Sequence, residues 1–204
     1  MKKFLDYLQE SAGNGLHVFD VDDTLFHTTA KVKVMHGKKQ VASLSNSEYN
    51  THQLPKDHHY DYSEFRDAEK FDKESKPMNR MLNKMKAIHN NAKKKGSKVI
   101  IATARADFDN KEKFLGAFRK HGVDIDNIHV HRAGNDKSEG TVAEKKARII
   151  SNQLKAGNFK RATLYDDSKE NLKHFLALKK EHPTVNFKAY HVQPSGSIVR
   201  HKEE

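Results

Sequence analysis

The chain reads Val18-Phe19-Asp20-Val21-Asp22-Asp23-Thr24-Leu25 near its start, an apolar run that ends in three acids within four residues. Carboxylates crowded at the end of a buried strand repel one another and resist losing their water. A divalent cation such as Mg²⁺ resolves that conflict. With Mg²⁺ bound, Asp20 can stay ionised as a nucleophile toward phosphorus, and Asp22 can pass a proton to the leaving group. The alternative is a strand followed by an acidic turn in which Thr24 caps a helix.

A second apolar run, Lys98-Val99-Ile100-Ile101-Ala102-Thr103-Ala104-Arg105, ends in a hydroxyl and a guanidinium. The Thr103 hydroxyl can hydrogen-bond a phosphoryl oxygen. Arg105 can clamp a phosphate through two parallel hydrogen bonds, which a lysine cannot do. The candidate substrate-binding residues are Thr24, Ala104 and Arg105.

Two later segments supply a cation and further acids. Residues 141–150 read as the start of a helix that carries Lys145 and Lys146 in its first turns. Such a cation can neutralise the nucleophile and the incoming phosphate dianion together. Residues 162–168 read as a short strand that ends in two adjacent acids, which suit a magnesium site built from oxygen ligands. The predicted metal ligands are Asp20, Asp22, Asp166 and Asp167.

Together these four segments resemble the motifs of the haloacid dehalogenase (HAD) superfamily of aspartate-nucleophile phosphatases: DxDx[TV], a Ser or Thr, a Lys, and a DD or GD pair. The resemblance covers about residues 16–192. It implies that Asp20 is the nucleophile, Asp22 the general acid and base, and Thr103 the residue that holds the phosphoryl group. For the catalytic lysine, Lys146 is slightly preferred to Lys145.

The last motif departs from the superfamily pattern. Asp167 falls where the usual metal-binding acid stands, and Asp166 replaces the common Gly. Asn171 occupies a position that is often a further Asp. The assignment of individual metal ligands at this end therefore stays open.

The segment Thr103-Ala104-Arg105 also resembles the Ser-Gly-Arg of the phosphatase domains of phage polynucleotide kinase/phosphatases, and the whole chain resembles phage-encoded HAD hydrolases. This resemblance implies a phosphorylated nucleic-acid end, with a 3′-phosphate, as substrate. Free nucleotides and other small phosphate esters are the competing substrates.

Apolar runs alternate with helical patterns over much of the chain. Strands are expected at 16–21, 98–103, 127–132, 162–166 and 185–192. Helices that face a core are indicated by Met78, Met81, Leu82, Met85 and Ile88, and by Phe114, Leu115 and Phe118. This alternation predicts an α/β fold with a parallel, doubly wound, Rossmann-like sheet flanked by helices. The HAD resemblance implies that the first, second and fourth strands lie side by side.

Residues 27–77 do not fit the alternation. Residues 30–44 predict a β-hairpin in which Val32 and Val34 face Val41. The remainder mixes aromatic with polar residues and lacks a long periodic helix. We therefore expect a hairpin flap and a small cap insertion, too short for a separate domain. Candidates for substrate contact, with unengaged surface loop residues as the simpler interpretation, are His58, His59, Tyr60 and Arg66.

His129 and His131 alternate on one expected strand and suggest a transition-metal pair. With Ile128 and Val130 on the opposite face, the two histidines also fit the polar side of an edge strand. We prefer the edge-strand interpretation.

The composition sets limits on function. The 204 residues suit one domain, and the absence of Cys excludes disulfides, thiolate metal sites and cysteine nucleophiles. The net charge of +11 favours either an anionic partner, such as a phosphorylated nucleic acid or nucleotide, or simple solubility. No segment approaches the roughly 18 apolar residues of a membrane span. We therefore expect a cytoplasmic protein without membrane association.

Residues 1–15 form a separate segment before the domain expected at 16–204. Residues 1–10 have an amphipathic helix pattern, which fits a leading helix packed on the sheet. The segment also resembles the capsid-targeting leader of internal proteins in T-even-like phages, and Leu8-Gln9-Glu10 resembles their prohead protease site. That resemblance implies the host cytoplasm or the virion as location, with capsid association. The alternative to a phosphatase is a virion-packaged or nucleic-acid-binding protein of HAD fold with little or no catalysis.

Overall fold

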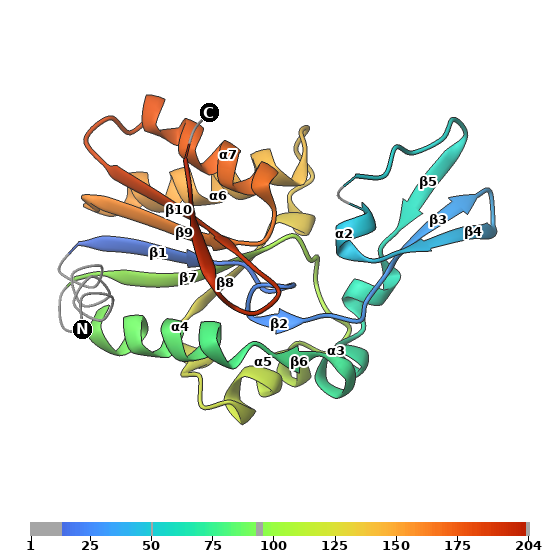
Figure 1. Ribbon diagram of the computed structural model, residues 1–204, viewed down its shortest axis with the longest axis horizontal. Helices are drawn as coiled ribbons and strands as arrows, with labels where there is room; N and C mark the ends of the chain where they lie inside the picture. Colours follow the sequence, from blue (N-terminus) through green and yellow to red (C-terminus); the bar gives the residue numbers. More distant parts are fainter. Residues whose placement is uncertain (1–13, 50, 93–95, 203–204) are drawn as a thin grey trace.

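The computed structural model describes residues 14–49, 51–92 and 96–202, and its centre is a six-stranded, mostly parallel sheet (Figure 1). The strands are β1 (Gly15–Phe19), β7 (Lys98–Thr103), β8 (His129–Arg132), β9 (Arg161–Asp166), β10 (Asn186–Val192) and β11 (Ile198–His201). They stand in the order β11-β10-β9-β1-β7-β8, and only β11 is antiparallel to its neighbour. The expected adjacency of the first, second and fourth strands is thus confirmed. The expected helix over residues 1–10 lies outside the described residues.

Helices cover both faces of the sheet, as the alternation predicts (Figure 1). One face carries α4 (Asn79–Ala92) and α5 (Lys111–Lys120), and the other carries α6 (Val142–Ala156) and α7 (Lys169–Ala177). Single 3₁₀ turns lie at Ser63–Arg66, Ile125–Asn127, Ala133–Asn135 and Leu178–Lys180. In the described part of the chain, no helix combines the length and apolar character that a membrane crossing needs.

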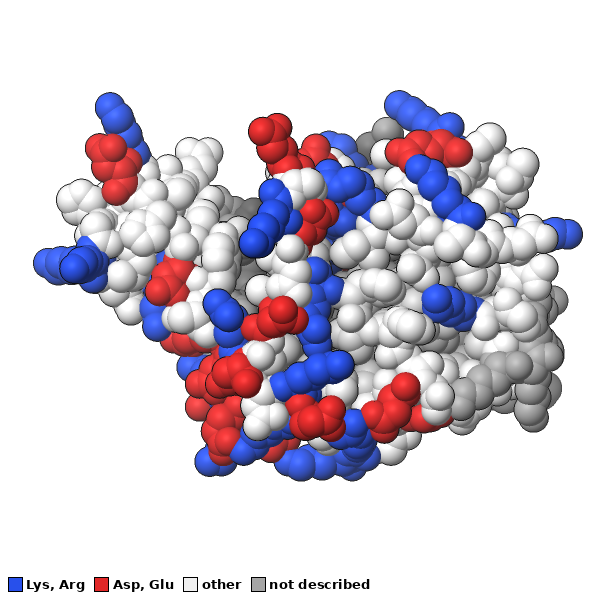
Figure 2. Space-filling model, turned by 180° about the vertical axis from the view of Figure 1, so that it is seen from behind, with Lys and Arg blue, Asp and Glu red and all other residues white. Residues whose placement is uncertain are grey.

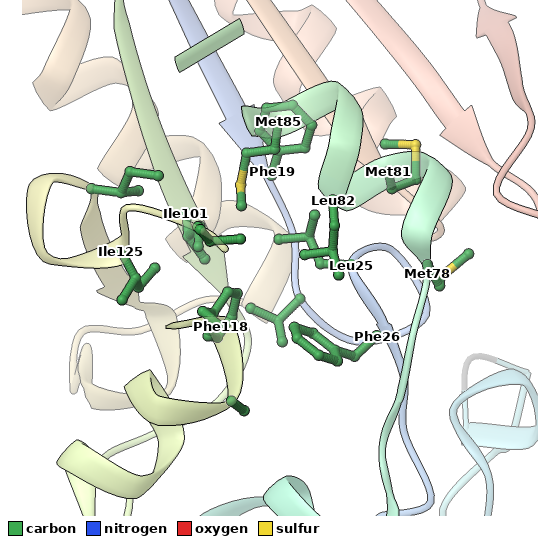
Figure 3. Packing of buried hydrophobic residues seen from close by; sticks show 14 of the residues in the cluster. Phe19, Leu25, Phe26, Met78, Met81, Leu82, Met85, Ile101, Phe118 and Ile125 are labelled. Carbon is green, nitrogen blue, oxygen red and sulfur yellow. The ribbon is translucent and has the colours of Figure 1, made fainter. Parts of the chain in front are cut away.

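The hydrophobic core consists of two clusters, one on each face of the sheet, because the side chains of a strand alternate between the two faces. Leu16 and Val18 of β1 pack under α6 and α7, and Phe19 packs on the opposite side against α4 and α5. Figure 3 shows this second cluster. The predicted methionine stripe is confirmed as core. Its first residue lies just before α4 and the others lie in α4, and all are buried: Met78, Met81, Leu82, Met85 and Ile88.

The irregular segment predicted at 27–77 forms an insertion that projects beyond one end of the sheet (Figure 1). Its base is closed by the antiparallel pair β2 (Phe26–His27) and β6 (Lys76–Pro77). Its outer part is a three-stranded antiparallel sheet in the order β4-β3-β5. The elements of the insertion are β3 (Val32–His36), β4 (Lys39–Leu44), α2 (Asn46–Tyr49), β5 (His58–Asp61) and α3 (Ala68–Glu74).

The predicted hairpin exists, but its predicted register is wrong. Val32 stands opposite Leu44 and Val34 opposite Ala42, and a bulge follows Val34. Val41 is 49% exposed and faces neither valine. The bulge adds a residue to one strand and so changes which side chains meet, a shift that the apolar pattern does not encode. The interpretation of residues 58–60 as a surface loop is also wrong, because they form β5.

Within the described part of the chain β8 pairs only with β7 and is an edge strand, so the edge-strand interpretation of His129 and His131 is confirmed. Their rings stack with centroids 6.2 Å apart. Burial and the charges of His129 and Lys98 lower the pKa of His131. Among the described residues, no third acid or histidine joins them in a metal-binding group.

Charge is mixed on the face of the molecule in Figure 2, where Lys and Arg alternate with Asp and Glu. Several cations on the protein surface are engaged in ion pairs, including Lys120–Asp72, Arg119–Asp126 and Arg148–Asp136. A dedicated nucleic-acid surface needs cations gathered with one sign. On this face the pattern favours solubility as the reason for the positive net charge.

Candidate active site

The predicted acids meet because β1 and β9 are parallel neighbours, whose carboxyl ends lie at the same edge of the sheet. The backbone N–H of Asp20 donates to the Tyr165 carbonyl at 3.0 Å and so continues the ladder one residue beyond β1. The rings of Phe19 and Tyr165 stack beneath it with centroids 4.6 Å apart. This packing fixes Asp20 beside Asp166, the last residue of β9.

One carboxylate oxygen from each of Asp20, Asp166 and Asp167 lies within 4.8 Å of the other two. Oxygens around one small dication stand roughly 3–4 Å apart, so a slight side-chain rotation lets these three share an ion. Asp20 and Asp166 are buried, and Asp167 is partly exposed toward a pocket. An all-carboxylate donor set fits a hard divalent cation. Asp22, also predicted as a ligand, is not part of this group.

Lys146 sits between two of these acids. Its ammonium donates to Asp20 Oδ1 at 2.6 Å and to Asp166 Oδ2 at 3.0 Å. Burial alone would lower the pKa of Lys146, but the charges of Asp166 and Asp20 outweigh it and hold the pKa above its usual range. The ammonium of Lys145 instead donates to the Asp136 carbonyl at 2.7 Å. Geometry thus places Lys146, the preferred of the two candidates, at the acids.

The acids outnumber the cation that reaches them. Burial raises the pKa of Asp20 to about 8, opposed by Lys146 and reinforced by Asp166 and Asp22. Burial likewise raises the pKa of Asp167 to about 9, reinforced by Asp166 and Asp20. Without another positive charge, this group of carboxylates retains a proton near neutral pH. A dication would take the place of that proton.

The two acids of the last motif have different surroundings. Asp166 accepts hydrogen bonds from the Ser168 N–H at 2.9 Å and from the Asn171 amide at 2.9 and 3.1 Å, in addition to Lys146. Asn171 therefore acts as a neutral donor that orients Asp166. The Asp167 carboxylate accepts no hydrogen bond from the described residues. Asp167 is the better placed of the two to give its oxygens to an ion.

Arg105 does not point at a free phosphate position as predicted. Its guanidinium forms a bidentate pair with Asp22, with N···O distances of 2.6 and 2.9 Å. It also donates to the Phe65 carbonyl at 2.8 Å and to the Thr28 hydroxyl at 3.0 Å. Both partners belong to the insertion. Arg105 is buried and links the second acid of the first motif to the base of the insertion.

The remaining predicted residues differ in their access to the site. Ala104 lines the pocket. Thr103 is fully buried, and its hydroxyl accepts the Arg105 N–H at 3.2 Å. Thr24 is also buried, in a turn that leads to β2 and not to a helix, so the capping interpretation is wrong. Its hydroxyl has no hydrogen-bond partner among the described residues and does not line the pocket.

A pocket of about 770 Å³ opens beside the acids, between the sheet edge and the insertion. Gly134 forms part of its wall, and a Cβ there would stand 2.7 Å from the Ala104 oxygen, so only glycine allows this close approach. Of the insertion residues predicted as candidates for substrate contact, Tyr60 and Arg66 line the pocket, and His58 and His59 do not. Other lining residues of the insertion were not predicted, because only their mixed aromatic and polar composition pointed to them. These are Val32, Asn46, Tyr49, His52, Tyr62 and Phe65.

Comparison of the chain with models of known protein families finds no match, and comparison with curated proteins finds none either.

The thermal stabilisation by Mg²⁺ should grow with pH. Asp20 and Asp167 have folded pKa values of about 8 and 9 against an ordinary value of 3.8, so above pH 3.8 the metal-free folded state keeps protons that the unfolded chain releases. Without metal, the contribution of these two groups to the free energy of unfolding therefore falls as the pH rises toward 8 to 9. Mg²⁺ bound to the ionised acids would recover that loss, so its effect is expected to be largest at the upper end of the window.

Calorimetric melting at about pH 6 and pH 8.5, with Mg²⁺ or with a chelator, measures this difference. In the Asp167→Asn variant, the rise in melting temperature caused by Mg²⁺ should increase much less between these two pH values than it does in the wild type. An equal Mg²⁺ shift at both pH values in the wild type would contradict the expected link between proton loss and metal binding.

Proposed function

We propose that this protein is a Mg²⁺-dependent phosphomonoesterase of the HAD type that acts through an aspartyl-phosphate. The observation that carries the proposal is the convergence of Asp20, Asp166 and Asp167 around one position, with Lys146 bridging two of them, at the wall of a pocket large enough for a substrate. Buried acids at such spacing are costly unless a cation joins them. Their cost is explained if the site binds an ion and a phosphate.

Asp20, Asp167 and Asp166 would hold the ion, and Mg²⁺ would supply positive charge to phosphoryl oxygens and to the ionised nucleophile. A carboxylate oxygen of Asp20 attacks phosphorus and forms a P–O bond, while the bond to the leaving oxygen breaks. Asp22 gives its proton to that oxygen. Asp22 then takes a proton from water, whose oxygen attacks phosphorus, and the bond to Asp20 breaks as phosphate leaves.

The contact between Asp22 and Arg105 must change before Asp22 can take part in these reaction steps. The bidentate pair holds the Asp22 carboxylate toward the insertion, away from the group formed by Asp20, Asp166 and Asp167. To serve as the general acid, the Asp22 carboxylate must leave Arg105 and take up a proton from solvent, which it then donates to the leaving group. Because Arg105 also binds Phe65 and Thr28, a movement of the insertion would accompany that exchange.

For the substrate we favour a nucleotide phosphate, at a nucleic-acid 3′ end or free. The size of the pocket supports an organic leaving group larger than a simple alcohol. Two measurements test the function. Phosphate release from a generic aryl phosphate should require Mg²⁺ and stop with a chelator. The value of kcat/KM should be higher on a 3′-phosphorylated oligonucleotide than on the matching mononucleotide, and equal values would defeat the end-processing preference.

The noncatalytic alternative predicts a different result. A packaged or nucleic-acid-binding protein without turnover would release no phosphate from any ester in a broad panel, with or without Mg²⁺. The intact set of Asp20, Lys146 and Asp167 favours catalysis, because a protein that only binds has no use for these closely grouped charges.

A further inference from the structure

A cluster of tyrosines in the insertion lines the same pocket as Asp20, and the proposed chemistry does not use it. Tyr49 ends α2, Tyr60 lies in β5 and Tyr62 follows β5. Tyr49 meets both others edge to face, with centroids 4.9 Å from Tyr60 and 5.9 Å from Tyr62. All three line the pocket. We call these three residues the tyrosine platform.

Polar contacts hold these rings in place. The hydroxyls of Tyr49 and Tyr62 are 2.8 Å apart, and that of Tyr60 is 2.9 Å from Nδ1 of His52. Burial and the hydrogen bond with Tyr49 raise the pKa of Tyr62, so the hydroxyl stays neutral at physiological pH. Tyr62 nevertheless keeps 45% of its surface exposed. The rings are therefore fixed while part of their surface remains available for contact.

A hydrogen bond connects α2, the helix that carries Tyr49, to the turn that follows Asp20. The side-chain amide of Asn46, in α2, donates to Asp23 Oδ2 at 2.8 Å, and Asp23 is three residues beyond Asp20. The pocket volume of about 770 Å³ is far more than an ion and a phosphate group fill. Pockets of this size accommodate whole organic ligands. The pocket therefore has room beside the platform for a group attached to the phosphate.

We propose that the tyrosine platform binds the nucleobase of the nucleotide that carries the phosphate. Fixed, partly exposed rings suit stacking, and every nucleobase has an aromatic face, so such binding tolerates different bases. The hydroxyls, already engaged with each other and with His52, leave little capacity for reading one base. This inference rests on the phosphatase function proposed above and adds the place where the base of its substrate binds.

Tyr62→Ala tests the platform through substrate choice. On thymidine 3′-monophosphate and on a 3′-phosphorylated oligonucleotide, kcat/KM should fall on the order of tenfold, the usual loss for one stacking contact. On glycerol 2-phosphate, which has no ring, kcat/KM should fall by clearly less than on the two base-bearing substrates. Tyr62→Phe keeps the ring and should retain most activity. Val41→Ala, an exposed change on the same insertion outside the pocket, should match the wild type on every substrate.

The comparison also separates the two sources of the base. A loss on only one of the two base-bearing substrates supports the proposal and assigns the platform to that source. An equal loss on glycerol 2-phosphate would overturn it, because the variant would then damage the site in general.

A binding measurement distinguishes failure of the platform from failure of the phosphatase. The chain has no Trp, so its fluorescence comes from six tyrosines, of which the platform holds three. In the Asp20→Asn variant, thymidine 3′-monophosphate should quench this emission saturably, inorganic phosphate should not, and added Tyr62→Ala should weaken the quenching. Absence of quenching by the nucleotide would overturn the platform even if esters are hydrolysed. Quenching without hydrolysis of any ester would overturn the phosphatase function alone.

Discussion

Asp20→Asn is expected to lower Mg²⁺-dependent phosphate release from an aryl phosphate by at least about 10³-fold. The amide keeps the shape of the side chain but is a poor nucleophile and a weak metal ligand. It also removes a negative charge from a site where burial already raises the pKa of Asp20 to about 8, so the folded protein should lose no stability without metal. A loss of activity with an unchanged or higher melting temperature would therefore identify a chemical role.

The neighbouring acid provides the control. Asp23 lies in the same turn but outside the group of three acids, and Asp23→Asn should retain activity within about an order of magnitude. Reduction of the reacting enzyme with borohydride converts an acyl phosphate to homoserine. Mass spectrometry should find homoserine at position 20 in the wild type. Substantial Mg²⁺-dependent activity in Asp20→Asn, or homoserine elsewhere, would rule out Asp20 as the nucleophile.

Lys146→Met is expected to lower kcat on the order of 10²- to 10³-fold, the usual loss when a fixed donor to a phosphoryl or oxyanion group is removed. The variant keeps the apolar stem and removes only the charge, which contacts Asp20 at 2.6 Å and Asp166 at 3.0 Å. Its melting temperature without metal should fall at pH 8, because two buried carboxylates lose their partner. Saturating Mg²⁺ should recover part of that fall.

Lys145→Met is the matched comparison, since the same change is made one residue earlier in the same helix. The Lys145 ammonium contacts the Asp136 carbonyl and none of the three acids. Activity should therefore stay within an order of magnitude of the wild type. If Lys145→Met is the more damaging of the two, the catalytic lysine has been assigned to the wrong residue.

The sequence contains a signal that separates Lys146 from Lys145, namely their positions on the apolar face of a helix. In α6, Lys146 is three residues after Ala143 and four before Ile150, and all three are buried on the face toward the sheet. Lys145 lies off that stripe. Helical periodicity could therefore have selected Lys146. Spacing from Asp166 alone separated the candidates by only one residue.

The role of Arg105 was beyond sequence reasoning. A guanidinium that directly follows Thr103 and Ala104 fits a phosphate clamp, and nothing in the local pattern points to Asp22 as its partner. The structure brings in Asp22, 83 residues away, together with the Phe65 carbonyl of the insertion. Which anion meets a cation depends on distances that only the folded chain sets.

The sequence by itself determined the parallel α/β sheet and the acids at the ends of β1 and β9, because apolar runs and the polar residues that end them are local patterns. Only the tertiary structure decided that Lys146 neutralises Asp20, that Arg105 holds Asp22, and that the insertion brings Tyr49, Tyr60 and Tyr62 to the pocket. The physical reason is that charge pairing and ring contacts depend on separation and burial between distant segments. Those quantities arise from packing and from the register of paired strands, which no short stretch of sequence specifies.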